Sequence, residues 1–263
     1  MHRPLRIADI LTFGEEAHGD AEIISETVEG GVHRTTYRET APRVRKMANA
    51  LLNIGVKHGD RVATLAWNGY RHFELYYAVS SMGAVLHTIN PRLFEEQIIY
   101  IMNHAEDKIL FLDSDFSKMV SNISEKLVYV KKYIIMDKKD SNLNKELTEA
   151  SFYEDLIDHK QTELDWPNFD EGKACSLCYT SGTTGNPKGV LYSHKSTLLH
   201  AWATAMPDTL GISANSVVMP VVPMFHANSW GLIYASPMSG AKLVLPGSKL
   251  DGESIYKIIN DEK

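Results

Sequence analysis

Residues 61–89, RVATLAWNGYRHFELYYAVSSMGAVLHTI, hold the pattern that decides the fold. The stretch opens with an apolar run from Arg61 to Ala66 that is typical of a strand. It continues with a helical pattern from His72 to Met82 and returns to a strand-like run from Val85 to Ile89. A strand, a helix and a strand in this order predict a βαβ unit, in which the two strands run parallel.

The same alternation of strand-like runs and helical patterns continues along the chain. Because helices of this length connect parallel strands, the expected fold class is α/β, with βαβ units forming parallel sheets flanked by helices. Upstream, Thr36 and Glu39 have the spacing of a capping box that opens a helix ending at Gly55. We expect further helices at 95–104 and 116–127, and further strands at 108–112 and 133–136.

The composition is that of an ordinary globular protein. The chain has 263 residues, of which 44% are hydrophobic and 23% charged, which is enough apolar material for a sizeable core and excludes disorder. Its net charge of −6 argues against a dedicated nucleic-acid-binding protein. No apolar stretch approaches the ~20 residues that a membrane span needs, and the first residues, MHRPLRIADILTFGEE, do not resemble a signal peptide. We therefore expect a cytoplasmic protein without a transmembrane segment.

Two cysteines, Cys175 and Cys178, have the C-x2-C spacing that can indicate a zinc or redox site. Neither a second such pair nor a matching histidine cluster follows them. The surrounding residues 174–179, ACSLCY, are typical of a buried strand, in which positions three apart point to opposite faces. We therefore favour a buried strand over a metal site.

Directly after that strand comes a polar loop, Thr180-Ser-Gly-Thr-Thr-Gly-Asn-Pro-Lys-Gly189. Its glycines let backbone N–H groups approach anionic oxygens closely, and Lys188 adds a positive charge. The hydroxyl groups can donate hydrogen bonds to phosphate or help to hold Mg²⁺. An ordinary surface turn does not need this set of groups, so the stretch predicts a phosphate-binding loop.

A Walker-type NTPase is the alternative for such a loop, and it requires a Gly-Lys-Ser/Thr sequence that leads into a helix. Here Pro187 precedes Lys188 and Gly189 follows it, so the Ser/Thr that would hold magnesium is absent. The next residues, Gly189 to Tyr192, are typical of a strand. We expect the loop to connect two strands.

Two motifs resemble a known family. Residues 179–190, YTSGTTGNPKGV, are similar to the signature of the adenylate-forming (AMP-binding) superfamily. Residues 220–230, PVVPMFHANSW, are similar to the second core motif of its fatty-acyl-CoA synthetase branch. The resemblance covers essentially the whole chain and implies that residues 1–263 are the N-terminal part of the large AMP-binding domain.

The resemblance implies an ATP-dependent carboxylate (fatty acid) CoA ligase. In this family a carboxylic acid attacks the α-phosphate of ATP and releases pyrophosphate, and the acyl-adenylate is then attacked by the thiolate of coenzyme A. The implied small molecules are therefore ATP, a carboxylic acid and coenzyme A, with Mg²⁺ neutralising charge on the departing pyrophosphate.

The resemblance also implies roles for individual residues. His226 borders the acyl carboxylate, which makes it the candidate catalytic and substrate-binding residue, and Trp230 is a gate between the acyl tunnel and the ATP site. If their segment is helical, these two residues share one face. The alternative is a purely structural role, in which Trp230 packs in the core and His226 is a buried histidine. In the loop, Thr180 matches the position whose hydroxyl contacts magnesium in this family. The residues that the resemblance implies bind the β- and γ-phosphates are Ser181, Gly182, Thr183, Thr184, Gly185 and Lys188.

The sequence ends at Lys263, roughly half the length that the family shows, and lacks the family's later motifs. We expect an incomplete large domain that does not turn over by itself. A second class of protein stays open, a non-catalytic half-length module that binds a partner or dimerises. In the fatty-acyl branch the N-terminal region takes part in dimer contacts, so a homodimer is possible.

Overall fold

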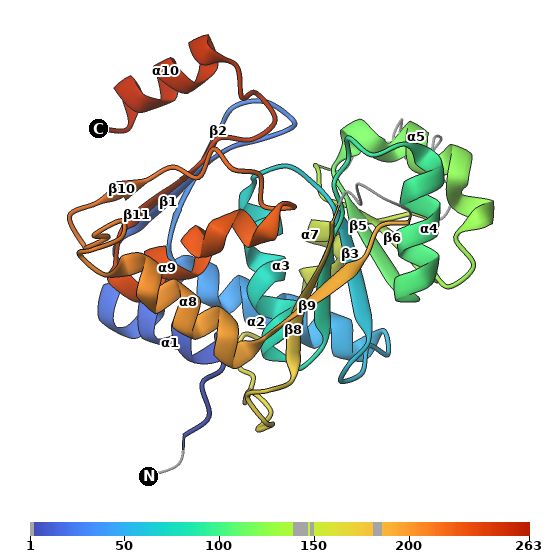
Figure 1. Ribbon diagram of the computed structural model, residues 1–263, viewed down its shortest axis with the longest axis horizontal. Helices are drawn as coiled ribbons and strands as arrows, with labels where there is room; N and C mark the ends of the chain where they lie inside the picture. The colour runs from blue at the N-terminus through green and yellow to red at the C-terminus, as the bar shows by residue number, and fades with distance from the viewer. Residues whose placement is uncertain (1–2, 139–146, 148–149, 181–185) are drawn as a thin grey trace.

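A computed structural model describes residues 3–138, 147, 150–180 and 186–263. Its larger sheet contains strands in the order β7-β6-β5-β3-β4-β8-β9 (Figure 1). All neighbouring pairs are parallel except β8 and β9, which are antiparallel. The expected α/β class is confirmed. The strands are β3 (Arg61–Leu65), β4 (Val85–Thr88), β5 (Ile109–Leu112), β6 (Lys132–Ile135), β7 (Ser151–Phe152), β8 (Ala174–Tyr179) and β9 (Gly189–Ser193).

Helices cover both faces of the larger sheet because strand side chains alternate between two apolar clusters. Val62 and Leu86 pack with α2 (Tyr37–Asn53), α3 (Tyr70–Ser81) and α7 (Tyr153–Ile157) on one face. Ala63 and Leu110 pack with α4 (Glu95–Ala105) and α5 (Ser117–Ile123) on the other. Figure 1 shows the second group, in green, on the side of the sheet away from α2 and α3.

A smaller sheet, in the order β10-β11-β1-β2, completes the described structure. Its strands are β1 (Glu22–Glu26), β2 (Val32–Thr36), β10 (Val217–Val218) and β11 (Lys242–Leu245). One face packs against α1 (Ile7–His18), α8 (His194–Ala205) and α9 (Leu232–Ser239), and the other against α10 (Gly252–Asp261) (Figure 1). The first and last parts of the chain therefore share one layer.

The sequence patterns and the structure differ in the N-terminal elements and in the helix expected over 116–127. The β1–β2 hairpin and α1 were not expected, because β1 pairs in parallel with β11 at the far end of the chain and this pairing leaves no local pattern. The helix expected over 116–127 is α5 flanked by two 3₁₀ turns, η1 (Ser114–Phe116) and η2 (Ser124–Lys126). In that segment Ser124 Oγ donates to Ser121 O, a side-chain bond that competes with regular helix.

The helix that begins after Thr36 is confirmed together with its capping box. The Thr36 hydroxyl accepts from Glu39 N, and Glu39 Oε2 accepts from Thr36 N at 3.0 Å. Within the described residues, no helix combines the length and the apolar character that crossing a bilayer requires.

Candidate functional site

The predicted phosphate loop is held at both ends by a strand hairpin. β8 leads into Thr180, and β9 begins directly after Lys188 and returns antiparallel beside β8. Thr180 N donates to Lys188 O at 3.0 Å, which closes the base of the loop. The side chains of Thr180 and Lys188 are both exposed, whereas Pro187 is buried. The residues predicted to grip the phosphates, Ser181, Gly182, Thr183, Thr184 and Gly185, lie outside the described residues.

The hairpin confirms that the loop connects two strands. Gly189–Ser193 is a strand and α8 starts only at His194, so no helix follows Lys188 directly. A Walker-type loop needs a helix at that point, because the helix N-terminus supplies part of its phosphate contacts. The observed connection therefore disagrees with a Walker-type architecture.

Tyr179, the last residue of β8, packs across the hairpin and contacts the end of α4. Its hydroxyl lies 2.6 Å from His104 Nδ1 at the end of α4. Across the hairpin, a Cβ on Gly189 would lie 3.2 Å from the Tyr179 ring and 3.1 Å from Leu177, so the ring packs on the bare Cα of the glycine. Sequence reasoning missed His104, because a contact between residues so far apart along the chain leaves no spacing to recognise.

The segment that carries His226 and Trp230 is not a right-handed helix. Ala227, Asn228, Ser229 and Trp230 all have left-handed backbone angles, with φ of 45°, 53°, 52° and 53°. They form a left-handed turn within η3 (Ala227–Gly231), so the condition under which His226 and Trp230 would share one face of a regular helix is not met. Left-handed geometry costs a non-glycine residue roughly 1–2 kcal/mol, so contacts elsewhere must hold the turn.

Buried polar groups hold the left-handed turn in place. Asn228 is 5% exposed, and its Nδ2 donates to Ser176 Oγ of β8 at 2.9 Å. The Tyr76 hydroxyl of α3 donates to Met224 O, just before the turn. Ser229 Oγ donates to Val222 O at 2.8 Å. The turn is therefore tied to the strand that leads into the phosphate loop.

His226 and Trp230 are both exposed, and Trp230 retains 59% of its accessible surface. Neither side chain belongs to the core, which disagrees with the alternative of a purely structural role for these two residues. Trp230 lines a pocket of about 320 Å³ between β9, α8, the left-handed turn and α9. The pocket is bounded by Tyr192, Ser196, Thr197, His200, Ala227, Asn228, Trp230, Gly231 and Tyr234. Sequence analysis identified only Trp230 among these residues.

The two cysteines belong to the core of β8. Cys175 Sγ lies 3.3 Å from Thr197 Oγ1, and Cys178 Sγ lies 3.2 Å from Thr88 Oγ1. Burial raises the pKa of the Cys175 thiol to about 11, so it stays protonated and unreactive at neutral pH.

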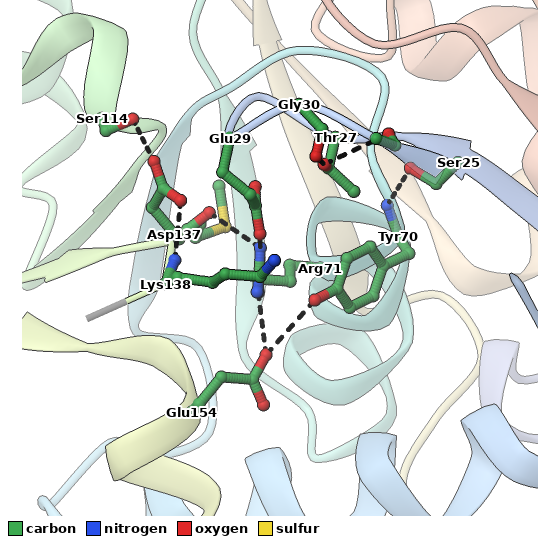
Figure 2. A network of polar contacts seen from close by, with 12 residues as sticks. Ser25, Thr27, Glu29, Gly30, Tyr70, Arg71, Ser114, Asp137, Lys138 and Glu154 are labelled. Carbon is green, nitrogen blue, oxygen red and sulfur yellow. Dashed lines mark hydrogen bonds and ion pairs between the residues drawn. The ribbon is translucent and has the colours of Figure 1, made fainter. Parts of the chain in front are cut away.

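A second hollow lies where the β1–β2 hairpin meets the larger sheet, and Figure 2 shows the charges around it. The Arg71 guanidinium lies 3.0 Å from Glu29 and 2.8 Å from Glu154, and it stacks on the Tyr70 ring. The hollow measures about 20 Å³, which is room for about one water molecule. Because Arg71 is already neutralised, this network joins α3 to the hairpin and α7 rather than binding a substrate.

The described residues provide few side chains that could coordinate a metal ion. They contain no group of three His, Cys, Asp or Glu side chains placed to hold one. The exposed Thr180 hydroxyl offers one oxygen atom at the base of the loop, 3.4 Å from Lys188 O. This fits Mg²⁺ bound mainly through substrate phosphates, because that ion usually keeps few protein ligands.

The larger sheet is a mainly parallel α/β sheet in which β8 leads into the Gly- and Thr-rich sequence 180–189, and this architecture is that of an α/β protein. The sequence matches the family described as AMP-binding enzyme over residues 14–263. The chain belongs to this family of AMP-binding enzymes.

Individual relatives agree with this assignment. The chain is 50% identical to a medium-chain-fatty-acid–CoA ligase of Ectopseudomonas oleovorans over 262 residues, covering 100% of this chain and 48% of the relative. It is 48% identical to a 3-methylmercaptopropionyl-CoA ligase of Ruegeria lacuscaerulensis, covering 99% and 48%. The crystal structure of a long-chain-fatty-acid-CoA ligase from Archaeoglobus fulgidus superposes with a TM-score of 0.86 at 22% identity, covering 99% and 51%, and shows the shared fold. The chain spans about half the length of the curated relatives it matches.

Proposed function

We propose that this chain is the ATP-binding and acyl-binding part of a carboxylate–CoA ligase that forms AMP. The observation that carries the proposal is the β8–β9 hairpin, which brings Thr180 and Lys188 together at the base of the loop with the family signature. In the same proposal, residues 1–263 are the N-terminal part of the large domain. The named relatives favour an aliphatic acid as the substrate.

The first step joins the acid to AMP. A carboxylate oxygen of the acid attacks the α-phosphorus of ATP, and the bond from that phosphorus to the bridging oxygen breaks to release pyrophosphate. Lys188 and the loop hydroxyls bind the β- and γ-phosphates, so that they stabilise the charge that collects on the leaving group. Mg²⁺, with Thr180 as a ligand, supplies further charge neutralisation on the phosphates when it is bound.

The second step transfers the acyl group to sulfur. The thiolate of coenzyme A attacks the acyl carbonyl carbon, and the bond to AMP breaks. His226 borders the acyl carboxylate in this proposal, and Trp230 covers the pocket that receives the acyl chain. The exposure of both side chains supports these roles, because each is free to contact a small molecule.

Pyrophosphate release tests the proposal on the native polypeptide that contains residues 1–263. ATP and octanoate should release pyrophosphate together, and ATP alone should not. Phosphate release without an acid would favour a Walker-type NTPase instead. Absence of both products would favour a non-catalytic module that binds a partner.

Lys188→Ala should lower the carboxylate-dependent rate at least ~10-fold, because it removes the loop's positive charge from the leaving group. Lys118→Ala is the matched control, since Lys118 is exposed on α5, away from the loop. Equal rates in the two variants would contradict the role assigned to Lys188.

Cytoplasmic location and a homodimer also belong to the proposal. Cell fractionation tests the first, with the protein expected in the cytoplasmic fraction rather than with membranes.

A further inference from the structure

Strand β8 and helix α4 both end beside the base of the loop that carries the family signature. Tyr179 is the last residue of β8, and it pairs with Gly189 at the start of β9. One position further, Thr180 N donates to Lys188 O at 3.0 Å. Tyr179 and Gly189 are therefore the last pair of the β8–β9 ladder, and the position of Tyr179 sets the point from which the loop starts.

Backbone pairing holds this end of β8 on one side only. The parallel ladder between β4 and β8 reaches as far as Cys178, opposite Thr88, and beyond that point β8 pairs with β9 alone. Residues 189–191 of β9 are themselves exposed, so this part of β9 buries little apolar surface. The side-chain contacts of Tyr179 therefore fix the end of β8 relative to the rest of the sheet.

Three contacts hold the Tyr179 side chain. Its hydroxyl lies 2.6 Å from His104 Nδ1 on the last turn of α4. Its ring lies 5.1 Å from the His87 ring of β4 between centroids, and it packs on the bare Cα of Gly189. His87 is fixed in turn, because its Nδ1 lies 2.7 Å from Asp107 Oδ2. Two strands thus hold the ring of Tyr179, and α4 holds its hydroxyl.

The contact with His104 contributes position more than stability. Burial raises the pKa of Tyr179 to about 12, so the phenol keeps its proton at neutral pH and can donate to His104 Nδ1. His104 is exposed and Tyr179 is half-buried. If the bond is lost, water can reach the imidazole and replace its partner, which makes the net cost in folding free energy small.

We propose that His104 is a positioning residue for the phosphate loop, which acts by holding the Tyr179 hydroxyl and so fixes where Thr180 and Lys188 present their side chains to ATP. Neither His104 nor Tyr179 touches the substrate in this account. The inference rests on the proposed function, because it takes the loop as the site of the ATP phosphates.

Calorimetric titration tests the inference without requiring turnover. MgATP and octanoate are titrated separately into the native polypeptide that contains residues 1–263. Tyr179→Phe and His104→Ala should each raise the Kd for MgATP about three- to tenfold, the effect of losing one hydrogen bond. The Kd for octanoate should not change. Because both substitutions remove the same bond, the double variant should lose about as much as one single variant.

A conservative variant and two matched controls sharpen the test. His104→Gln should restore much of the affinity for MgATP, because its side-chain carbonyl can accept from the Tyr179 hydroxyl. Tyr133→Phe makes the same change at a half-buried position on β6, which β5, β3 and β4 separate from β8. His159→Ala removes an exposed histidine after α7. Both controls should bind MgATP as the wild type does.

Urea unfolding separates a positioning role from a structural one. Tyr179→Phe and His104→Ala should unfold at nearly the wild-type urea concentration. A clear loss of stability, an equal rise in both Kd values, or additive effects in the double variant would overturn the role of His104. Unchanged affinity for MgATP in both single variants would overturn it as well.

Pyrophosphate release distinguishes this inference from the proposed function. A polypeptide that binds MgATP with the expected differences among the variants, but releases no pyrophosphate with any acid, would support the role of His104 and refute the ligase. Carboxylate-dependent release with equal MgATP affinity in all variants would refute only the role of His104. A polypeptide that does not bind MgATP would overturn both.

Discussion

Single residues in this chain show how position changes the chemistry of a side chain. Asp113 follows β5 directly, and its Oδ2 accepts a hydrogen bond from Trp67 N at 2.7 Å. Burial raises the pKa of Asp113 to about 8, and the nearby carboxylates of Asp115 and Asp137 act in the same direction. The bond from Trp67 N opposes this change without cancelling it. Asp113 is therefore an acid that the folded protein prefers to keep protonated.

Asp113→Asn should make the protein less sensitive to alkaline pH. Between about pH 4 and pH 8 the folded state holds a proton on Asp113 that the unfolded state has lost, so wild-type stability falls as the pH rises through this window. The asparagine keeps an oxygen to accept from Trp67 N and does not ionise. Relative to the wild type, the variant should gain ~2 kcal/mol or more between pH 5 and pH 9, measured by urea unfolding.

Asp208→Asn is the control for this prediction, because Asp208 is exposed and lies in the segment after α8 rather than among the charges around Asp113. It should show a much smaller pH-dependent gain. A difference between wild type and Asp113→Asn that stays constant with pH would show that Asp113 is ionised in the folded state.

At the scale of elements, the left-handed turn and the β8–β9 hairpin together build the candidate site. Asn228 links them through Ser176, and Trp230 and Tyr234 then face a common pocket. The left-handed backbone of the turn is strained, and its buried hydrogen bonds offset the energetic cost of that strain.

Two substitutions in the turn should change stability in opposite directions. Asn228→Ala removes a buried donor, and the Ser176 hydroxyl loses this hydrogen-bond partner. The free energy of unfolding should therefore fall by ~1–3 kcal/mol. Ala227→Gly places the residue that tolerates a positive φ where φ is 45°, so it should be neutral or stabilise by up to ~1 kcal/mol. Chemical denaturation of both variants tests the pair, and destabilisation by Ala227→Gly would speak against a strained turn.

These elements differ in how far the sequence alone predicts them. The strand expected from Arg61 to Ala66 is β3 at Arg61–Leu65, and the cap at Thr36 is correct, because apolar alternation and capping are local properties. The connection of two strands by the phosphate loop is likewise predicted, because residues 189–192 are typical of a strand and no Ser/Thr follows Lys188. The left-handed turn was not foreseen, because its partners Ser176 and Tyr76 are distant in sequence. Of the residues that line the pocket, Trp230 is predicted from its motif, whereas Tyr192 is not, because the elements that meet there are distant in sequence.

At the scale of the whole molecule, large apolar side chains are exposed on neighbouring elements. Leu191 of β9 is 62% exposed, Trp202 of α8 is 56% exposed, and Leu210 after α8 is 60% exposed. Exposed apolar groups on adjoining elements favour association with another surface. The chain spans about half the length of its curated relatives, and association of the 263-residue chain through these side chains is a prediction.

Light scattering coupled to size-exclusion chromatography measures this association. At concentrations of about 10 µM or more, the chain should elute as a dimer or larger species, and Trp202→Glu should shift it toward the monomer, because a charge disfavours apolar contact. Val128→Glu, at a 73% exposed position on another part of the surface, should not. A wild-type chain that remains monomeric would contradict the prediction and the proposed homodimer.

Detection of the acyl-adenylate tests the central claim most directly. The native polypeptide that contains residues 1–263 is incubated with ATP, Mg²⁺ and octanoate, without coenzyme A, and the products are identified by mass spectrometry. The account predicts octanoyl-AMP and pyrophosphate, and conversion of the adenylate to octanoyl-CoA and AMP when coenzyme A is added. ADP and phosphate formed without any need for the acid, or no nucleotide product at all, would contradict it.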